Sequence, residues 1–372
     1  MERRNSMAPA SKFWKDKRIF ITGHTGFKGV WLSLWLQSLD ATVYGYSTSS
    51  RAQHNGQSLV DMQSFQGDIC DDLHTLQDAI TQTNPEIVIH MAAQPLVRRA
   101  FHDPLSTYRT NIVGTASLLQ AVRRCDSVRA VIVVTTDKCY EVQNWDWAYR
   151  ESDALGGNDP YSSSKACMEF VVQSFRDSFF AVRNIGIATA RAGNMIGGGD
   201  WAEDRLIPDM IRSFAAGKAV TLRNPAARRP WQFVLEALRG YMLLAEQLYN
   251  RGSQYSGAWN FGPAVSDIQP VQWIAQKLAA GWGAEAQWGI QSGSNLPQES
   301  QMLRLDCSKA RAELGWEPRL PLSEALALTV DWYRHFYGGK NLRQKYLEQI
   351  AGYAKKIERG ESQPTFSEIP CT

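Results

Sequence analysis

The sequence predicts an α/β fold built on a doubly wound parallel sheet of the Rossmann type, with a smaller, interleaved substrate lobe in the C-terminal part of the chain. Three observations lead to this prediction. Short apolar runs alternate with helical patterns over roughly the first 190 residues, which is typical of parallel strands. A glycine-rich turn separates the first apolar run from the first helical pattern, and the alternation ends after Arg191. Such sheets bind ligands at the carboxyl ends of their strands, so we expect the site at that edge.

The expected elements follow from the spacing of apolar residues. Strands are expected where short aliphatic runs occur, at 18–22, 42–46, 64–68, 87–91, 130–135 and 185–191. Helices are expected where apolar residues recur every three or four positions, at 30–39, 107–124, 161–179, 206–217, 234–249 and 271–281. Trp31 and Trp35 share a face of the first helix, and we assign both to the core.

The domain organisation is predicted from these patterns and from composition. Residues 13–192 form the dinucleotide-binding domain, which also receives parts of 231–262, and residues 193–340 form the substrate-binding lobe. Residues 1–12 are expected as a flexible tail, within which Met7 is an alternative start of translation, and residues 341–372 as a polar, peripheral tail.

Charge and cysteine usage exclude several classes of protein. With 40 Lys and Arg against 37 Asp and Glu, the net charge is +3, too balanced for a protein that coats nucleic acid. The six cysteines show no paired spacing, so neither a zinc site nor any other metal site is expected. No apolar run approaches the roughly 18 residues of a membrane span, and a cytoplasmic location is expected.

The glycine-rich turn carries the first candidate site. Gly23, Gly26 and Gly29 follow a strand and precede a helix, which is the context in which backbone amides approach a pyrophosphate. Asp68 follows the third strand and could accept a hydrogen bond from adenine, or it could instead cap the next helix. No acid follows the second strand to hold a ribose hydroxyl, and Arg51 could face a 2′-phosphate, so the residues leave NAD and NADP both open.

Tyr161 and Lys165 form the second candidate site. At a spacing of four, the two side chains share one helix face, and an ammonium beside a phenol lowers a phenol pKa that starts near about 10. Tyr161 would then act as a general base toward an alcohol. The alternative is a Tyr–Lys contact on the surface.

A third candidate lies where the strand at 130–135 ends. Thr136 can hydrogen-bond a substrate oxygen, and Asp137 and Lys138 form a pair able to divide acid and base roles. The alternative is a solvated turn. In the second lobe, Arg205, Arg223 and Arg229 could clamp a diphosphate and Asn194 could meet a phosphate, although each alone reads as a solvated side chain or a turn cap. Cys139 and Cys167 flank the site and are assigned to packing.

Several segments together resemble an extended short-chain dehydrogenase/reductase of the NAD-dependent epimerase/dehydratase family, and within it the CDP-glucose 4,6-dehydratases. The segments that carry this resemblance are TGHTGFKG (22–29), HMAAQPLVR (90–98), TTDKCYE (135–141), DPYSSSK (159–165), RAGNMIGGGDWAEDRLIPD (191–209), RPWQ (229–232) and LDCSKA (305–310). The resemblance covers about residues 13–337.

The resemblance implies a lyase that borrows NAD as an oxidant. Tyr161 would deprotonate the glucose 4-hydroxyl as C4 gives its hydride to the nicotinamide, with Lys165 on the nicotinamide ribose and Thr136 on the 4-oxygen. Water would then leave across C5 and C6, and the hydride would return to C6, giving CDP-4-keto-6-deoxyglucose for deoxysugar and O-antigen synthesis. In related enzymes an Asp-Glu pair performs the elimination; here Lys138 stands in place of the Glu, and Asp137 can still act as the acid.

The resemblance also implies ligand contacts and a partner. The expected cofactor contacts are Gly23, Thr25, Gly26, Phe27, Gly29, Asp68, Ile69, Ala92, Ala93, Gln94, Asn111, Tyr161 and Lys165. The expected substrate contacts are Asn194, Arg205, Arg229 and Glu299. Phe233 departs from the family by standing where a His is expected. Two helices per subunit, 107–124 and 161–179, would form a homodimer, with a tetramer left open. The alternatives are a 4-epimerase, a dehydratase for another nucleotide, or a catalytically silent NAD-binding protein.

Overall fold

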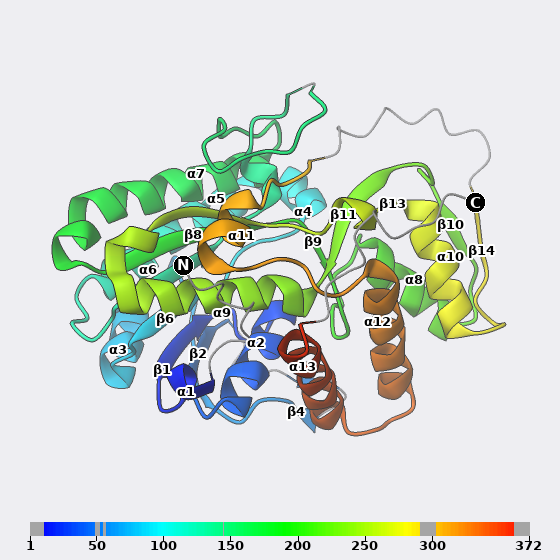
Figure 1. Cartoon of the computed structure of the whole chain (residues 1–372), viewed down its shortest axis with the longest axis horizontal. Coiled ribbons are helices and arrows are strands. Elements are labelled where there is room, and N and C mark those ends of the chain that lie inside the picture. The colour runs from blue at the N-terminus through cyan, green and yellow to red at the C-terminus, as the bar shows by residue number, and fades with distance from the viewer. Residues whose placement is uncertain (1–10, 49–52, 55–56, 144, 291–302, 361–372) are drawn as a thin grey trace.

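A seven-stranded parallel sheet forms the centre of the molecule. The computed structural model describes residues 11–48, 53–54, 57–143, 145–290 and 303–360. The strand order is β12-β8-β7-β6-β1-β2-β5, and every neighbouring pair is parallel (Figure 1). The strands are β1 Arg18–Thr22, β2 Thr42–Ser47, β5 Gln63–Gln66, β6 Ile87–His90, β7 Ala130–Val134, β8 Gly186–Ala192 and β12 Gly257–Phe261. The predicted doubly wound α/β class is confirmed.

The order of the strands fixes where a ligand can enter. From β1 the chain runs outward to β2 and β5 on one side, and then to β6, β7 and β8 on the other side. The crevice therefore opens between the carboxyl ends of β1 and β6, where Gly23 and Met91 follow their strands.

Two apolar cores cover the two faces of the sheet. Along β7, Ala130, Ile132 and Val134 pack into one core, while Val131 and Val133 pack into the other, as the two-residue period of a strand requires. The first core is shared with α2 (Phe27–Ser38) and α9 (Val234–Arg251). The second is shared with the helices α3 (Leu73–Thr83), α6 (Gly114–Val122) and α7 (Pro160–Phe175).

A second lobe stands beside the sheet, on the right in Figure 1. It has a three-stranded sheet, β9 (Asn194–Ile196), β11 (Arg228–Phe233) and β13 (Ile268–Pro270), and the pair β10 (Val220–Leu222) and β14 (Trp288–Ile290). Its helices are α8 (Leu206–Ala215), α10 (Val271–Trp282) and α12 (Leu322–Tyr337). The lobe is interleaved with the large sheet, because β11 leads directly into α9, and β12 then pairs with β8.

The remaining elements are short connections. They are α1 (Ser11–Trp14), β3 (Gln53–His54), β4 (Gln57–Ser58), α4 (Val97–His102), α5 (Pro104–Tyr108), α11 (Ser308–Leu314) and the helical turns η1 (Arg109–Val113), η2 (Asp137–Cys139), η3 (Arg176–Phe180), η4 (Ala181–Arg183), η5 (Gly252–Tyr255) and η6 (Val265–Asp267). The helix expected over 107–124 is thus α5, a π-helical turn and α6 in succession.

Two expected tails differ from the structure. The chain beyond residue 340 forms a long helix, α13 (Leu342–Glu358), so the prediction of a peripheral tail is wrong for this stretch. Tyr346 and Tyr353 of α13 are buried against Trp31 and Trp35 of α2, with ring centroids 4.5 and 5.8 Å apart. At the other end, helix α1 begins inside the predicted tail of residues 1–12, and residues 1–10 lie outside the described part of the chain.

Among the described residues, no helix combines the length and the apolar character that crossing a membrane requires. The cytoplasmic location stays a prediction.

Candidate active site

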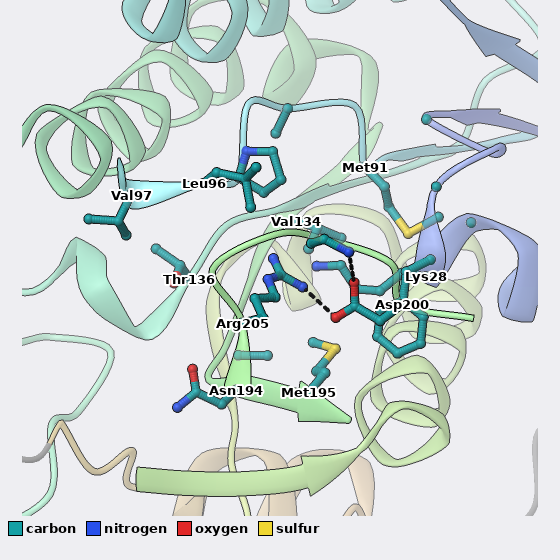
Figure 2. Close-up of a pocket in the computed structure, with 18 of the residues that line it drawn as sticks. Lys28, Met91, Leu96, Val97, Val134, Thr136, Asn194, Met195, Asp200 and Arg205 are labelled. Atoms are coloured by element: carbon teal, nitrogen blue, oxygen red, sulfur yellow. Dashed lines mark hydrogen bonds and ion pairs between the residues drawn. The ribbon is translucent and has the colours of Figure 1, made fainter. Parts of the chain in front are cut away.

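A cavity of about 970 Å³ lies at the carboxyl edge of the large sheet, between that sheet and the second lobe. Its walls come from the glycine turn after β1, the segments after β5, β6 and β7, the start of α7, and the loop between β9 and α8. Figure 2 shows side chains from both the sheet and the lobe turned into this space. The cavity therefore brings together residues that are far apart in the sequence.

The glycine turn fits a dinucleotide pyrophosphate. Gly23 has a φ of 74°, and a Cβ there would stand 2.7 Å from the backbone nitrogen of Ala92. A Cβ on Gly29 would stand 2.3 Å from the carbonyl oxygen of Gly23. Only glycine allows this close approach of the turn to its neighbours, and the first turn of α2 then lines the cavity with its amino end. The sequence-based interpretation of the turn is consistent with this geometry.

Most of the residues expected at the cofactor line the cavity. Those that do are Gly23, Thr25, Gly26, Phe27, Gly29, Asp68, Ile69, Ala92, Ala93, Tyr161 and Lys165. Thr25 also shares a hydrogen bond of 2.7 Å between its hydroxyl and that of Ser47 at the end of β2. No acid follows β2 in the sequence, and Ser47 and Thr48 line the cavity at that place. Arg51 lies outside the described residues.

Gln94 and Asn111 do not line the cavity, and their role as direct cofactor contacts stays a prediction. The Asn111 carboxamide accepts from the Gln94 amide nitrogen at 2.8 Å and donates to Ser164 Oγ at 2.9 Å. The Gln94 side chain donates to Thr107 Oγ1 at 2.8 Å and accepts from the Leu96 amide at 2.6 Å. Both side chains are buried, and they hold the segment after β6 in place.

Asp68 is held by the residue two positions later. Its Oδ1 accepts from the Cys70 amide at 2.9 Å and from the Cys70 thiol at 2.7 Å. Asp72 caps α3, accepting from the Thr75 amide at 3.0 Å, so the alternative of Asp68 as the helix cap is wrong. Asp68 remains on the cavity wall, available to a ligand.

Tyr161 and Lys165 are fixed by the start of α7. Asp159 caps this helix, accepting from the amides of Tyr161 and Ser162 at 2.9 and 3.0 Å, and Pro160 occupies its first turn. Tyr161 is 8% exposed and Lys165 is 3% exposed, so the alternative of a surface contact is wrong. The Lys165 ammonium donates to the carbonyl oxygen of Val134 at 3.4 Å.

Burial dominates the titration of this pair. It raises the pKa of Tyr161 to about 12, against a lowering by the Thr136 hydrogen bond. Burial, and then the charge of Lys28, lower the pKa of Lys165 to about 7. The expected lowering of the phenol pKa is thus wrong for the protein alone, because burial disfavours the phenolate and the Lys165 amine is directed to a carbonyl.

Thr136, Asp137 and Lys138 form a tight turn directly after β7. The Thr136 hydroxyl donates to Asp137 Oδ1 at 3.0 Å and accepts from the Lys138 amide at 3.3 Å. Thr136 and Asp137 are buried, which excludes the alternative of a solvated turn. Burial raises the pKa of Asp137, and the neighbouring Lys138 opposes this rise. A raised pKa suits this carboxyl to the role of a proton donor.

The second lobe supplies polar side chains to the opposite wall. Asn194, Arg205 and Arg229 all line the cavity, whereas Arg223 does not. Glu299 lies outside the described residues. Cys139 is buried in a small apolar cluster, in agreement with the packing role assigned to it.

Two cavity residues were missed by sequence reasoning. Asp200 pairs with Arg205 at 2.9 Å, and Lys28 lies beside Asp200 (Figure 2). Burial, and then the charge of Arg205, lower the pKa of Lys28 to about 8. The available signal was the lysine inside the glycine-rich turn. Together with Lys165 and Arg205, Lys28 makes the cavity suited to anionic ligands.

The comparisons with known proteins cover most of the chain. Residues 20–329 match the family model described as GDP-mannose 4,6 dehydratase. The chain is 46% identical over 356 residues to the CDP-glucose 4,6-dehydratase of Salmonella typhimurium, covering 93% of this chain and 99% of that protein. It is 28% identical to a dTDP-glucose 4,6-dehydratase of Xanthomonas campestris, covering 84% of this chain and 90% of that protein.

Solved structures share the fold. A dTDP-glucose 4,6-dehydratase from Streptomyces venezuelae with NAD and TYD bound has a TM-score of 0.71 at 23% identity, covering 88% of this chain and 99% of that one. A UDP-glucose 4-epimerase from Brucella ovis in complex with NAD has a TM-score of 0.73 at 21% identity, covering 86% of this chain and 98% of that one.

Proposed function

The chain belongs to the GDP-mannose 4,6-dehydratase family, and from this membership we propose that it converts CDP-D-glucose to CDP-4-keto-6-deoxy-D-glucose and water. The observation that carries this function is the gathering of two sets of groups in one cavity. Tyr161 and Lys165 suit oxidation of an alcohol, and the buried Asp137 beside them suits loss of a hydroxyl. The strong similarity to the Salmonella enzyme supports CDP as the nucleotide.

The cofactor is NAD, held at the glycine turn. Gly23, Gly26 and the first turn of α2 would take the pyrophosphate, and Asp68 with Ile69 would take the adenosine half. When bound, NAD supplies a reversible acceptor for the hydride that leaves C4 and later returns to C6. Ala92 and Ala93 leave this part of the wall without bulky side chains.

Tyr161 acts as the general base toward the 4-hydroxyl. Its pKa of about 12 means that the phenolate must be favoured by a neighbouring positive charge. The protonated Lys165, one turn further along the same face of α7, is that charge, and a pKa of about 7 allows it to be present near neutral pH. Thr136 holds the sugar 4-oxygen near the phenol, since its hydroxyl already interacts with Tyr161.

Asp137 and Lys138 carry out the elimination. Lys138 is placed to take the C5 proton, the C6–O bond breaks, and Asp137 gives its proton to the departing hydroxyl, which leaves as water. The raised pKa of Asp137 supports its role as the acid. The ketone at C4 makes the C5 proton acidic enough for an amine to remove it.

The second lobe holds the nucleotide diphosphate. Arg205 and Arg229 present guanidinium groups to the cavity, and Asn194 presents a carboxamide at the start of β9. The role of Glu299 stays a prediction, because this residue lies outside the described chain.

Two copies of the chain pair through α5, α6 and α7. Helices α5 and α6 both pack against α7, and large apolar side chains are exposed on α5 (Leu105), on the turn η1 between α5 and α6 (Val113) and on α7 (Phe170). Exposed large apolar side chains on neighbouring helices are typical of an interface. A second copy of the chain is the partner proposed for it.

The test follows a deuterium atom placed at C4 of CDP-glucose. The proposed function predicts a 4-keto-6-deoxy product that carries the deuterium at C6, with no NADH accumulating. Deuterium at C4 of CDP-galactose would instead indicate a 4-epimerase, a reaction for which the buried Asp137 acid is unnecessary. Deuterium in accumulated NADH would indicate a dehydrogenase, and either result contradicts the proposal.

A further inference from the structure

Glu169 lies on the same face of α7 as Tyr161 and Lys165, one turn beyond the lysine. It does not line the main cavity. Its side chain is 5% exposed and borders a second, smaller cavity of about 300 Å³. In the proposed function, this buried carboxylate neither binds a ligand nor transfers a proton.

The Glu169 carboxylate joins three elements. Its Oε1 accepts from the Thr135 hydroxyl at 2.5 Å, which ties α7 to the end of β7. Its Oε2 accepts from the Thr189 hydroxyl at 2.6 Å and from the Arg191 guanidinium at 2.8 Å, which ties α7 to β8. Thr135 is directly followed by Thr136, so this carboxylate sets the position of the turn that bears Thr136, Asp137 and Lys138.

The guanidinium that pairs with Glu169 is itself buried. Its counter-ion Arg191 is 3% exposed, donates to the Tyr140 hydroxyl at 2.8 Å, and is flanked by Glu151, whose carbonyl oxygen it contacts at 3.2 Å. Within the described chain, the Nε of Arg191 has no hydrogen-bond partner. A buried guanidinium held in this way depends strongly on its one carboxylate contact.

The Glu169 carboxylate also interacts electrostatically with Lys165. The charges that face its ammonium are Lys28 from α2, which disfavours the protonated form, and Glu169 from α7, which favours it. Without Glu169, burial and Lys28 would act against the ammonium with little opposition.

We propose that Glu169 is a positioning residue for the reaction: it holds the Thr136–Lys138 turn in register with α7 and keeps Lys165 protonated. This inference rests on the proposed function, in which Tyr161 requires a protonated Lys165. Glu169 touches neither ligand and acts through Thr135 and Lys165.

Three variants separate the two parts of the proposal. Glu169→Gln removes the charge and keeps the shape. Thr135→Val removes the link to β7 and keeps the charge. Glu151→Gln is the matched control, because it removes a carboxylate from the wall of the same small cavity without touching Thr135 or Thr189.

The first readout is the titration of Lys165 in the protein without ligands. The protein is acetylated with trace acetic anhydride at a series of pH values, and peptide mass spectrometry measures the acetylation of Lys165. Lys165 lines the main cavity, so the reagent can reach it. We expect Glu169→Gln to lower the Lys165 midpoint by about one pH unit or more, while Thr135→Val and Glu151→Gln leave it unchanged. This readout needs no substrate, so it remains valid if the proposed function fails.

The second readout is the pH profile of turnover with CDP-glucose. We expect Glu169→Gln to move the basic limb of kcat/KM toward lower pH, and Thr135→Val to lower kcat about tenfold with little change in KM. A lower melting temperature of Glu169→Gln with an unchanged Lys165 midpoint and pH profile would overturn the proposal. If Glu169→Gln does not fold, Glu169→Asp is measured in its place. A normal kcat in both Glu169→Asp and Thr135→Val would then also overturn the proposal.

Discussion

Burial shifts the pKa values of the catalytic cluster toward the neutral forms in the protein alone. Burial raises the pKa of both Tyr161 and Asp137 and lowers that of Lys165. The physical reason is the same for all three, since a charged group loses its hydration inside the protein. Asp137 is therefore ready to donate a proton, while Tyr161 becomes a base only where positive charge is brought to it.

Replacing Tyr161 tests the base. We expect Tyr161→Phe to lower kcat by about a thousandfold, within the range that a general base contributes, because no other phenol lines the cavity in the described chain. NAD binding, measured by fluorescence quenching, and the melting temperature should change little. Tyr108→Phe is the control, because Tyr108 bonds Ser163 at 2.7 Å outside the cavity. Turnover close to that of the unchanged protein in Tyr161→Phe would end this assignment.

The elimination pair makes a different prediction. Lys138→Met should slow the exchange of the C5 proton with heavy water about a hundredfold or more and leave oxidation at C4 less affected. Asp137→Asn should allow exchange at C5 but slow the loss of water. These rates are measured by mass spectrometry of the sugar in deuterated buffer. Slower C4 oxidation with normal C5 exchange in Lys138→Met would show that Lys138 only positions the substrate.

Most of the cavity wall could be predicted at the residue scale, and the exceptions have a common cause. Motif spacing located Gly23, Thr136 and Tyr161 because each follows or begins a regular element. The Asn111 side chain instead bonds the backbone of Gln94, and the Gln94 side chain bonds Thr107, which spacing alone cannot reveal. Lys28 was missed because its importance arises from Asp200 and Arg205, which come from the other lobe.

At the scale of elements, strands and helices with strong local patterns were predicted well. The runs that became β1, β6 and β7 are continuous and aliphatic, and their bounds agree with the structure to within a residue. β12 was missed as a strand because its sequence, GAWNF, has no alternation, and pairing with β8 alone makes it a strand. The polar helix α13 was missed because its few apolar residues gain their packing partners only from α2.

His90 joins three of these elements and predicts a pH effect on stability. Its ring nitrogens lie 2.6 Å from Thr22 Oγ1 on β1 and 3.1 Å from Thr115 Oγ1 on α6. Burial, and then the charge of Lys165, lower the pKa of His90 to about 3. Below about pH 6.5 the unfolded chain therefore binds a proton that the folded protein does not, and the stability falls until the pH reaches the folded pKa.

The expected loss from His90 alone is about 2 kcal/mol of unfolding free energy between pH 7 and pH 5. Urea unfolding of the protein and of His90→Asn at the two pH values measures it. Between pH 7 and pH 5, His90→Asn should lose about 2 kcal/mol less unfolding free energy than the unchanged protein. His24, with its pKa lowered to about 4, contributes equally to both proteins. An equal pH dependence of the two proteins would show that His90 is protonated in the folded state.

At the scale of the whole molecule, two cores hold the sheet, and one helical face remains apolar. Phe170 is 55% exposed on this face and lies on α7, the helix that also carries Tyr161 and Lys165. We expect the protein to be a dimer and Phe170→Asp to convert it to a monomer, as measured by size-exclusion chromatography with light scattering. Val265→Asp, which changes an apolar residue of the other lobe that is 73% exposed, should remain a dimer. A monomeric unchanged protein would refute the interface.

The most direct measurement offers the purified protein NAD together with CDP-, dTDP-, UDP- or GDP-glucose in turn. The 4-keto-6-deoxy product is detected by its absorbance in alkali, and NADH is followed in parallel. The account predicts product from CDP-glucose alone, without accumulation of NADH. Product from another nucleotide sugar, accumulation of NADH, or no reaction with CDP-glucose would contradict it.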